Sequence, residues 1–343
     1  MIDTSEKNFE ETIENALIGA SRGASDWTIH DHAVPYATTE PHYIKRRPDD
    51  YNRALCLDPE MLFNFIYTTQ PQMWEKLRTQ HGTEVKERFT RRLVNEIRAR
   101  GTLNVLRRGV KDSGCRFEMA YFKPVSGLNE EHQRLYNGNI LSIIRQLHYS
   151  EKDPNKSLDL VLFLNGIPII TAELKNPLND QTVQDAVRQY RRDRDPKESI
   201  FRFDRCLAHF AVDTDLVYMT THLKGGSTVF LPFNKGRDGG AGNPDNPDGF
   251  RTSYLWEDIW QRDGILEIIG HYLQVVELED DRGKKTGEKA LIFPRYRQFD
   301  TVRKLIPDAR VNGSGQHYLI QHSAGSGKSN TIAIALPSAL RTP

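Results

Sequence analysis

The sequence predicts an α/β protein in which helices flank a mixed sheet. Two observations carry this prediction. Apolar residues at helical spacing dominate roughly the first hundred positions, and strand-like apolar runs, one helix among them, follow up to residue 233. With 343 residues and 38% hydrophobic content, the chain is long enough for about two domains with packed cores.

Most of the expected helices lie in roughly the first hundred residues. Apolar residues at helical spacing behind Ser5 predict an amphipathic opening helix. The segments 61–77 and 85–98 have the same spacing, and Gly101 is a typical helix stop. Late in the chain, 255–276 predicts a further helical stretch.

The strands are expected in the middle of the chain, each from a run rich in β-branched, aromatic or aliphatic residues. These runs are 116–122, 140–149, 158–164, 167–174, 210–220 and 228–233. Gly, Asn, Pro and Asp dominate 234–249, which predicts a polar surface loop. The charged, glycine-containing stretch 279–289 is typical of a linker, which predicts one domain over 1–278 and the start of a second over 290–343.

Composition excludes several classes of protein. Lys and Arg (47) nearly balance Asp and Glu (46), so any nucleic-acid surface must come from local clusters of charge. Cys56, Cys115 and Cys206 lie far apart without a CxxC motif, which indicates reduced thiols and neither a disulfide scaffold nor a zinc site. No apolar run approaches the ~20 residues that span a membrane, and the polar start is unlike a secretory signal. We therefore expect a soluble cytoplasmic protein.

The first candidate site consists of Asp159, Glu173 and Lys175. Glu173 and Lys175 are two apart on one expected strand and therefore share a face. Asp159 lies on the preceding strand, so its face depends on the hairpin turn at Asn165-Gly166. A two-residue type I′ turn would put Asp159 and Glu173 on opposite faces.

A three-residue loop, Leu164-Asn165-Gly166 with Gly166 left-handed in a G1 bulge, puts all odd-numbered residues of both strands on one face. The even face then becomes uniformly apolar. We predict this loop because the two-residue turn would mix apolar and charged residues on both faces.

Two carboxylates that converge on one point repel each other unless a cation lies between them. Carboxylate oxygens suit Mg²⁺ or Mn²⁺, which would polarise a phosphoryl oxygen and supply hydroxide. Lys175 would orient that nucleophile or stabilise developing negative charge. An isolated match to this pattern is more often a surface salt bridge at a strand end. The order of the surrounding elements therefore decides between a salt bridge and a nuclease site.

That order is a helix with acidic residues, the Asp strand, the Glu-x-Lys strand and another helix, and it resembles the PD-(D/E)xK nuclease core. The resemblance implies that Asp159 and Glu173 hold the metal and that Lys175 is the catalytic lysine. It also implies that an acid of the first helix, Glu11 or Glu14, completes the cluster.

Helicase-linked nucleases of this kind often carry a QxxxY motif on the following helix. Tyr190 fits the tyrosine of this motif, while Ala186 stands at the glutamine position. Either Gln184 or Gln189 could take the place of the missing glutamine, or the contact is absent.

The second candidate site is a nucleotide phosphate loop, Ala-Gly-Ser-Gly-Lys-Ser at 324–329. We expect a strand over 318–322 before it and a helix over 328–336 after it. Backbone N–H groups around Gly325 and Gly327 would cradle ATP phosphates, with Lys328 on the β/γ oxygens and Ser329 on Mg²⁺.

The spacing around this loop resembles superfamily 2 helicases, so the second domain is expected to be the start of a RecA-like motor. Upstream, 293–298 resembles the segment in which such motors use a glutamine, here Gln298, to read adenine.

Taken together, the carboxylate site, the stretch 229–236 and the segment 294–298 leading to the phosphate loop resemble the restriction subunit of type I restriction–modification enzymes. The resemblance implies a longer protein that docks on methyltransferase and specificity subunits, pulls double-stranded DNA using ATP, and cuts it. Basic clusters that could contact the DNA backbone are 45–47, 91–92, 107–108 and 191–192, the last favoured because its helix follows the active strand.

Two alternatives remain open. A helicase-linked repair nuclease would use the same two motifs, although there the nuclease is expected after the motor. A noncatalytic DNA-binding or assembly module with a degenerate site would also fit the alanine at position 186.

Overall fold

The structure is a computed structural model and describes residues 6–19, 42–124, 129–177, 180–238, 240–280, 282–313, 315–320 and 331. The helical elements are α1 (Glu6–Ile18), η1 (Pro48–Asp50), α2 (Pro59–Thr69), α3 (Pro71–His81), η2 (Gly82–Glu84), α4 (Val85–Arg100), α5 (Thr102–Arg108), α6 (Glu130–Asn137), α7 (Val183–Arg192), η4 (Ser199–Phe201), η5 (Leu255–Ile259), α8 (Arg262–Glu267), η6 (Ile268–Tyr272) and α9 (Tyr296–Asn312). The strands are β1 (Ile44–Arg46), β2 (Val110–Asp112), β3 (Cys115–Phe117), β4 (Leu141–His148), β5 (Ser157–Leu164), β6 (Ile167–Leu174), β7 (Ala208–Val212), β8 (Val217–Thr220), β9 (Leu231–Pro232), β10 (Gln274–Glu279) and β11 (Lys285–Ile292).

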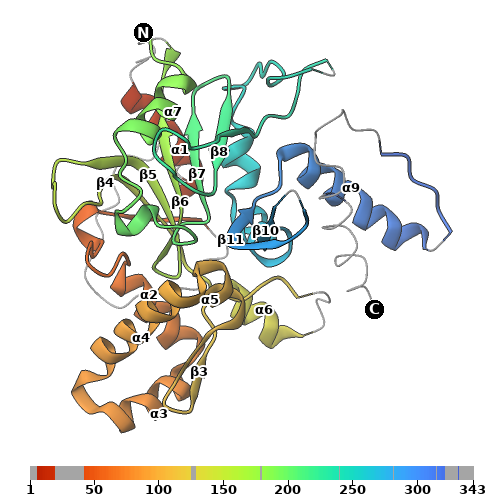
Figure 1. Cartoon of the computed structure of the whole chain (residues 1–343). Coiled ribbons are helices and arrows are strands. Elements are labelled where there is room, and N and C mark those ends of the chain that lie inside the picture. The colour runs from red at the N-terminus through yellow and green to blue at the C-terminus, as the bar shows by residue number, and fades with distance from the viewer. Residues whose placement is uncertain are drawn as a thin grey trace.

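Seven strands form one mixed sheet in the order β1-β4-β5-β6-β7-β8-β9, which confirms the expected mixed sheet flanked by helices. Strands β4, β5 and β6 form an antiparallel meander, and β6 continues through α7 into the parallel strand β7. Figure 1 shows this sheet in one lobe, with α2 to α5 and the hairpin β2-β3 in a second lobe at its end.

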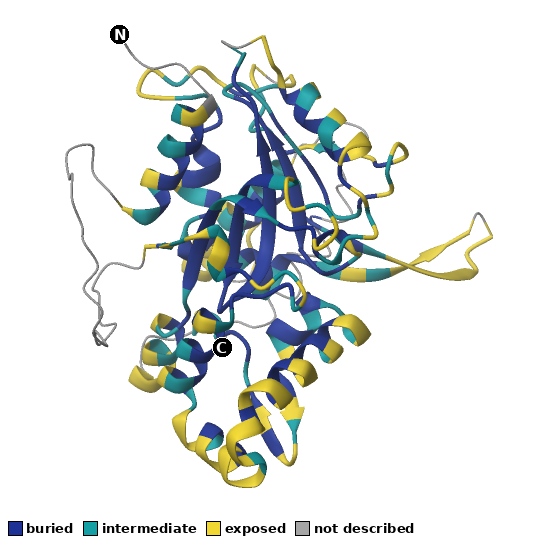
Figure 2. Cartoon of the chain, turned by 90° about the vertical axis from the view of Figure 1, so that its left-hand side faces the viewer, coloured by how far each residue is buried: buried dark blue, intermediate teal, exposed yellow. Residues whose placement is uncertain are grey.

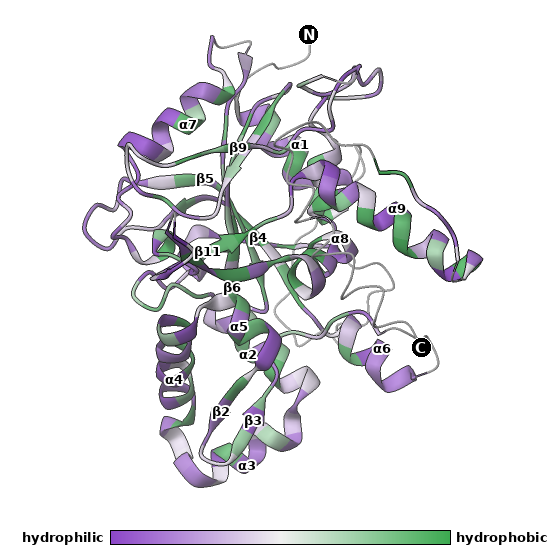
Figure 3. Cartoon of the chain, turned by 45° about the vertical axis from the view of Figure 1, so that its right-hand side comes forward, coloured by the Kyte–Doolittle hydropathy of each residue, from purple (hydrophilic) through white to green (hydrophobic). Residues whose placement is uncertain are grey.

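Both faces of the central strands are covered. Every position of β6 and all but the first of β5 are buried, so these strands read as nearly continuous apolar runs. Helix α1 packs against β4 and β6 on one face, while α7 contributes a separate apolar cluster on the other face. In Figure 2 the sheet is a buried slab, and in Figure 3 its strands are hydrophobic while much of α7 is hydrophilic.

The turn between β5 and β6 is not the predicted three-residue loop. Leu164 pairs with Ile167, so the turn has two residues, Asn165 (φ 51°) and Gly166 (φ 76°). Positive φ at both positions is the type I′ geometry that Asn-Gly favours. The buried Asn165 side chain fixes the turn because its amide donates to the carbonyl of Met119 (2.9 Å).

A β-bulge inside the hairpin nevertheless brings odd-numbered residues of β5 opposite odd-numbered residues of β6. Leu162 pairs with Ile170 and Phe163 with Pro168, which leaves Ile169 as an extra residue on β6. Pro168 has no N–H to give to the ladder, so a bulge beside it costs little. From the bulge to the pair Leu160–Ala172, odd positions face odd positions. This is the parity that was predicted, and it comes from the bulge and not from a three-residue loop.

Other predicted elements also differ from the structure, among them the strands predicted over 116–122 and 228–233, which are only Cys115–Phe117 and Leu231–Pro232. Pro71 divides the helix predicted over 61–77 into α2 and α3, because proline starts a helix and cannot continue one. The strand predicted over 210–220 is two strands, and the Asp213 carboxylate caps the turn between them. The helix predicted over 255–276 is three short helical segments that end before β10.

The stretch predicted as a linker, 279–289, lies at the tip of the antiparallel hairpin β10-β11, which projects from the sheet domain (Figure 2). Of the strand predicted over 318–322, the described residues 318–320 are exposed and belong to no strand. The phosphate loop at 324–329 lies outside the described residues. Among the helices that are described, none is long and apolar enough to cross a membrane.

Candidate active site

Asp159, Glu173 and Lys175 come together where β6 ends. Leu160 pairs with Ala172, so the next residues along the two strands, Asp159 and Glu173, lie at the same end of the hairpin. The Asp159 carboxylate accepts the backbone N–H of Leu174 through Oδ2 (2.8 Å), and the same oxygen is 4.0 Å from Lys175 Nζ. Asp159 and Lys175 are each 8% exposed, so the cluster lies just below the surface.

Glu173 is fully buried and pairs with a cation. Arg194, which follows α7, donates from Nε to Glu173 Oε1 (2.6 Å). The second oxygen, Oε2, is buried and has no hydrogen-bond partner among the described residues. Burial first, and then the nearby Asp159, raise the pKa of Glu173 well above its usual range.

Asp159 and Glu173 are therefore the residues that could hold a divalent cation. A buried carboxylate oxygen without a partner, beside a second carboxylate, is a place where a hard cation relieves both desolvation and repulsion. The described residues contain no cluster of three acidic, histidine or cysteine side chains arranged to bind a metal. The remaining ligands would be water or substrate oxygens.

The first helix brings several acidic residues near the cluster. Glu11 or Glu14 was expected to complete it. Glu14 Oε2 instead accepts from Lys45 (2.8 Å) and Arg145 (3.2 Å), and Glu11 is 3.7 Å from the same arginine.

Glu10 is the acid of α1 that is linked to Asp159. Gln146 Nε2 donates to both Glu10 Oε1 (2.9 Å) and Asp159 Oδ1 (3.3 Å). Burial, and then Asp159, raise the pKa of Glu10 to about 7. The sequence held a signal for this position, because Glu10 and Glu14 are one turn apart and lie on one face of the helix.

Tyr190 lies on the same side of the sheet as the carboxylates, but it bonds to other groups. Its hydroxyl is 2.8 Å from Thr171 Oγ1, which is also 2.8 Å from His209 Nδ1. Burial lowers the pKa of His209 to about 3, so the ring stays neutral. Ala186, at the glutamine position of the QxxxY motif, packs in the apolar cluster beneath α7, while Gln184 is exposed.

The basic clusters named from the sequence are partly engaged within the protein. Arg46 pairs with Asp58 (2.9 Å), and Arg107 donates to the carbonyl of Ile269 (2.7 Å). Arg191 lies over the Phe230 ring at 6.0 Å and donates to a backbone carbonyl. These arginines make contacts within the protein, and their spacing in the sequence did not reveal those contacts. Arg194 was also missed, although it directly follows the helix after the Glu-x-Lys strand.

Gln298, the predicted adenine reader, is buried in the first turn of α9, where its Oε1 accepts the backbone N–H of Arg295 (2.8 Å). This contact caps the helix. The predicted phosphate-loop residues lie outside the described residues: Gly325, Gly327, Lys328 and Ser329.

Comparison with known proteins identifies the region that carries this site. Residues 60–228 match the family described as "Type I restriction enzyme R protein N terminus (HSDR_N)". Residues 60–228 carry the region that this family model describes. It is also 26% identical over 290 residues to the "Putative type I restriction enzyme MjaVIIIP endonuclease subunit" of Methanocaldococcus jannaschii. That alignment covers 78% of this chain and 25% of the relative, so the chain spans about a quarter of the length of this R-protein relative.

Proposed function

We propose that this R-protein region hydrolyses phosphodiester bonds of double-stranded DNA with the help of Mg²⁺ or Mn²⁺. The observation that carries the proposal is the convergence of Asp159, Glu173 and Lys175 at the end of β6. Two carboxylates and a lysine at one point are the groups that metal-assisted phosphoryl transfer requires.

In this proposal Asp159 and Glu173 hold the cation. The cation would polarise the scissile phosphate and lower the pKa of the attacking water. Arg194 holds one oxygen of Glu173, which leaves Oε2 directed at the site. The backbone N–H of Leu174 fixes Asp159 in the same way.

Lys175 is the group that acts on the reacting atoms. Its ammonium lies 4.0 Å from Asp159 Oδ2, within reach of a phosphate bound at the carboxylates. A cation there would stabilise the negative charge that develops on the phosphate and orient the nucleophile.

In the full-length protein, cleavage would be coupled to ATP-driven translocation. The Gly-x-Gly-Lys-Ser motif at 325–329 supports ATP binding, and the R-protein family supports association with methyltransferase and specificity subunits in the cytoplasm. The sequence motif and the family membership are the grounds for this part of the proposal.

Nicking of supercoiled plasmid with Mg²⁺ or Mn²⁺ tests the proposal. We expect Asp159→Ala, Glu173→Ala and Lys175→Ala each to reduce the rate by at least about a hundredfold. Glu87→Gln, an exposed acid on α4, is the matched control and should cut like the wild type. Metal-dependent cleavage that survives Asp159→Ala would refute the assignment.

A noncatalytic DNA-binding module is the second candidate function. Two observations favour it: Arg194 already neutralises the buried Glu173, and alanine replaces the motif glutamine at 186. It predicts that DNA binding persists while neither the wild type nor the variants cut DNA. A helicase-linked repair nuclease is disfavoured because the nuclease here precedes the phosphate loop.

A further inference from the structure

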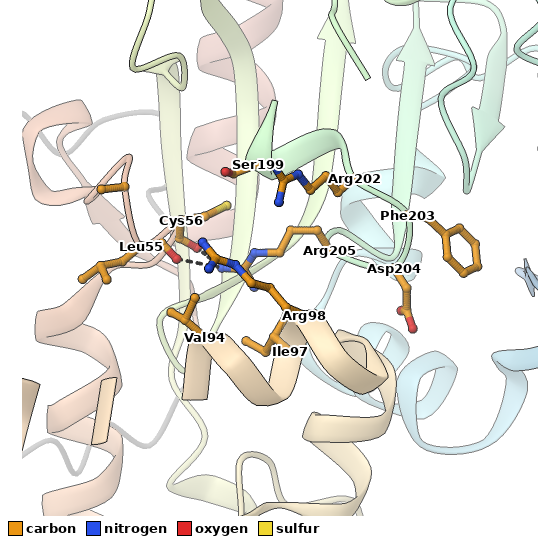
Figure 4. A pocket seen from close by; sticks show the side chains of 11 residues that line it. Leu55, Cys56, Val94, Ile97, Arg98, Ser199, Arg202, Phe203, Asp204 and Arg205 are labelled. Atoms are coloured by element: carbon orange, nitrogen blue, oxygen red, sulfur yellow. Dashed lines mark hydrogen bonds between the residues drawn. The ribbon is translucent and has the colours of Figure 1, made fainter. Parts of the chain in front are cut away.

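A second charged site lies at the opposite end of the sheet, in a cavity of about 170 Å³ between the two lobes. Val94, Ile97 and Arg98 of α4 form one wall, and the segment from Ser199 to Arg205 that leads into β7 forms the other. Figure 4 shows the side chains of Arg98, Arg202 and Arg205 gathered in this cavity from both walls.

Arg205 is held firmly but is only partly paired. It is 7% exposed, and its Nη2 donates to the backbone carbonyls of Leu55 and Cys56. Its Nη1 is buried and has no hydrogen-bond partner among the described residues. A buried guanidinium nitrogen without an acceptor is costly, and a negatively charged group in the adjoining cavity would remove that cost.

The other charges of the cavity do not neutralise Arg205. Arg98 and Arg202 add two more guanidinium groups, and both are exposed at the cavity. Asp204 is the acid of the lining, and Figure 4 shows its carboxylate turned away from the three guanidinium groups. Burial raises the pKa of Asp204 to about 6, and Lys289 offsets only part of this rise.

Hydrogen bonds from α5 hold one wall of the cavity in position. Thr102 donates its backbone N–H to the carbonyl of Asp204 (2.8 Å) and its hydroxyl to the carbonyl of Arg205 (2.7 Å). The Asp204 carboxylate also lies directly against Gly101, where no Cβ could fit. Helix α5 therefore fixes the segment that carries Arg202 and Arg205.

We propose that this cavity binds a phosphate group through Arg98, Arg202 and Arg205. Guanidinium groups form charge-assisted, often bidentate hydrogen bonds with phosphate oxygens. Three of them arriving from two walls match a tetrahedral anion better than a planar carboxylate, which offers two oxygens. The volume accommodates a phosphate group together with several waters.

This site is separate from the carboxylate cluster. Cys206, next to Arg205, bonds to the carbonyl of Pro168 at the start of β6, whereas Glu173 and Lys175 lie at its end. Five residues of strand separate the two positions, about 17 Å. The bound phosphate would bridge the helical lobe and the sheet lobe, and the proposal does not depend on nuclease activity.

Calorimetric titration of the chain with inorganic phosphate, at constant ionic strength set with chloride, tests the proposal. We expect binding by the wild type, and Arg98→Gln and Arg202→Gln should each weaken it about tenfold or more. Both side chains are exposed, so these variants should fold. Arg88→Gln, on the same helix but outside the cavity and paired with Glu84, should bind phosphate like the wild type.

A parallel titration with a short DNA duplex, without divalent metal, identifies the source of the phosphate. If the group belongs to DNA, duplex affinity falls in Arg98→Gln but not in Arg88→Gln, and inorganic phosphate competes with DNA. If it is a free phosphate, only the phosphate titration changes. The proposal is overturned if neither ligand responds to Arg98→Gln, or if Arg88→Gln weakens binding equally.

Discussion

At the scale of residues, the site depends on the buried carboxylate of Glu173 and on Arg194, the cation that pairs with it. Glu173 is fully buried, and Arg194 satisfies one of its oxygens. Arg194 lowers the pKa of Glu173, but burial and Asp159 raise it more, so that pKa stays well above its usual range. Arg194 fixes Oε1 of Glu173, and Oε2 has no hydrogen-bond partner among the described residues.

Breaking the ion pair between Arg194 and Glu173 should lower the stability of the protein. We expect Arg194→Ala to lower the free energy of unfolding by about 3 kcal/mol, because it leaves the buried Glu173 carboxyl without its ion-pair and hydrogen-bond partner. Arg188→Ala removes an exposed pair with Asp185 near the same helix end and should cost about 0.5 kcal/mol or less. Urea unfolding compares the two variants, and equal stabilities would contradict the role assigned to Arg194.

The sequence was informative about which residues meet and less so about their surroundings. Alternation along two strands predicted that Asp159 and Glu173 share a face, and in the structure Asp159 lies near enough to Glu173 to raise its pKa. Glu10 and Arg194 were not predicted, because their approach depends on how α1 and the segment after α7 pack in three dimensions. No spacing rule along a single element carries that information.

At the scale of elements, the β5-β6 hairpin decides whether the site exists. Local turn chemistry favours the two-residue Asn-Gly turn, and the hydrophobic pattern requires the opposite parity. The bulge at Ile169 satisfies both demands. The sequence predicted the parity because burial is a strong constraint, but it did not locate the extra residue, whose only local sign was Pro168.

The hairpin turn also joins the two lobes. Asp58 at the start of α2 donates its backbone N–H to the carbonyl of Gly166 (2.8 Å), and a Cβ at Gly166 would lie 2.3 Å from the Asp58 carbonyl oxygen. Gly166→Ala should therefore destabilise the protein by at least about 2 kcal/mol more than Gly114→Ala. Gly114 has the same φ of 76° but open space around it, so the comparison isolates the steric contact. Thermal or urea unfolding that gave equal losses would contradict the close packing of the turn on α2.

Helix α1 makes stability depend on pH. The folded-state pKa of Glu10 is about 7, above its ordinary value of 4.5, so the folded protein holds this proton more tightly than the unfolded chain. The contribution of Glu10 to stability is therefore present below about pH 4.5 and is lost as the pH rises through about 7. Glu10→Gln should have a smaller decline in melting temperature between pH 5 and pH 8 than the wild type. An equal decline would contradict the burial of Glu10 beside Asp159.

At the scale of the whole molecule, the described part is a sheet domain with a helical lobe, followed by a hairpin and α9. The boundary predicted at 279–289 coincides with the hairpin β10-β11, which holds charged residues away from the core. Polar, glycine-containing composition indicates exposure, and it does not distinguish an irregular linker from an exposed hairpin. That the second domain begins near 290 stays a prediction.

The phosphate loop gives a prediction for the molecule as a whole. We expect the chain to bind ATP through the loop, and Lys328→Ala to weaken binding at least about tenfold by removing the cation that faces the β/γ oxygens. Fluorescent nucleotide titration measures this. Lys304→Ala, an exposed lysine on α9 paired with Asp300, is the control and should bind like the wild type. Unchanged affinity after Lys328→Ala would refute the ATP site.

The central claim is that Asp159 and Glu173 form a metal site, and Mn²⁺ binding measured by calorimetry or electron paramagnetic resonance tests it most directly. Asp159→Asn keeps an oxygen that can accept the Leu174 N–H, so the fold should survive. The account predicts one Mn²⁺ site in the wild type, tighter at pH 8 than at pH 6, because binding competes with the protons that the raised pKa values of Glu10 and Glu173 retain. Asp159→Asn should weaken it by at least about tenfold. Equal Mn²⁺ affinity in the wild type and in Asp159→Asn would contradict the account.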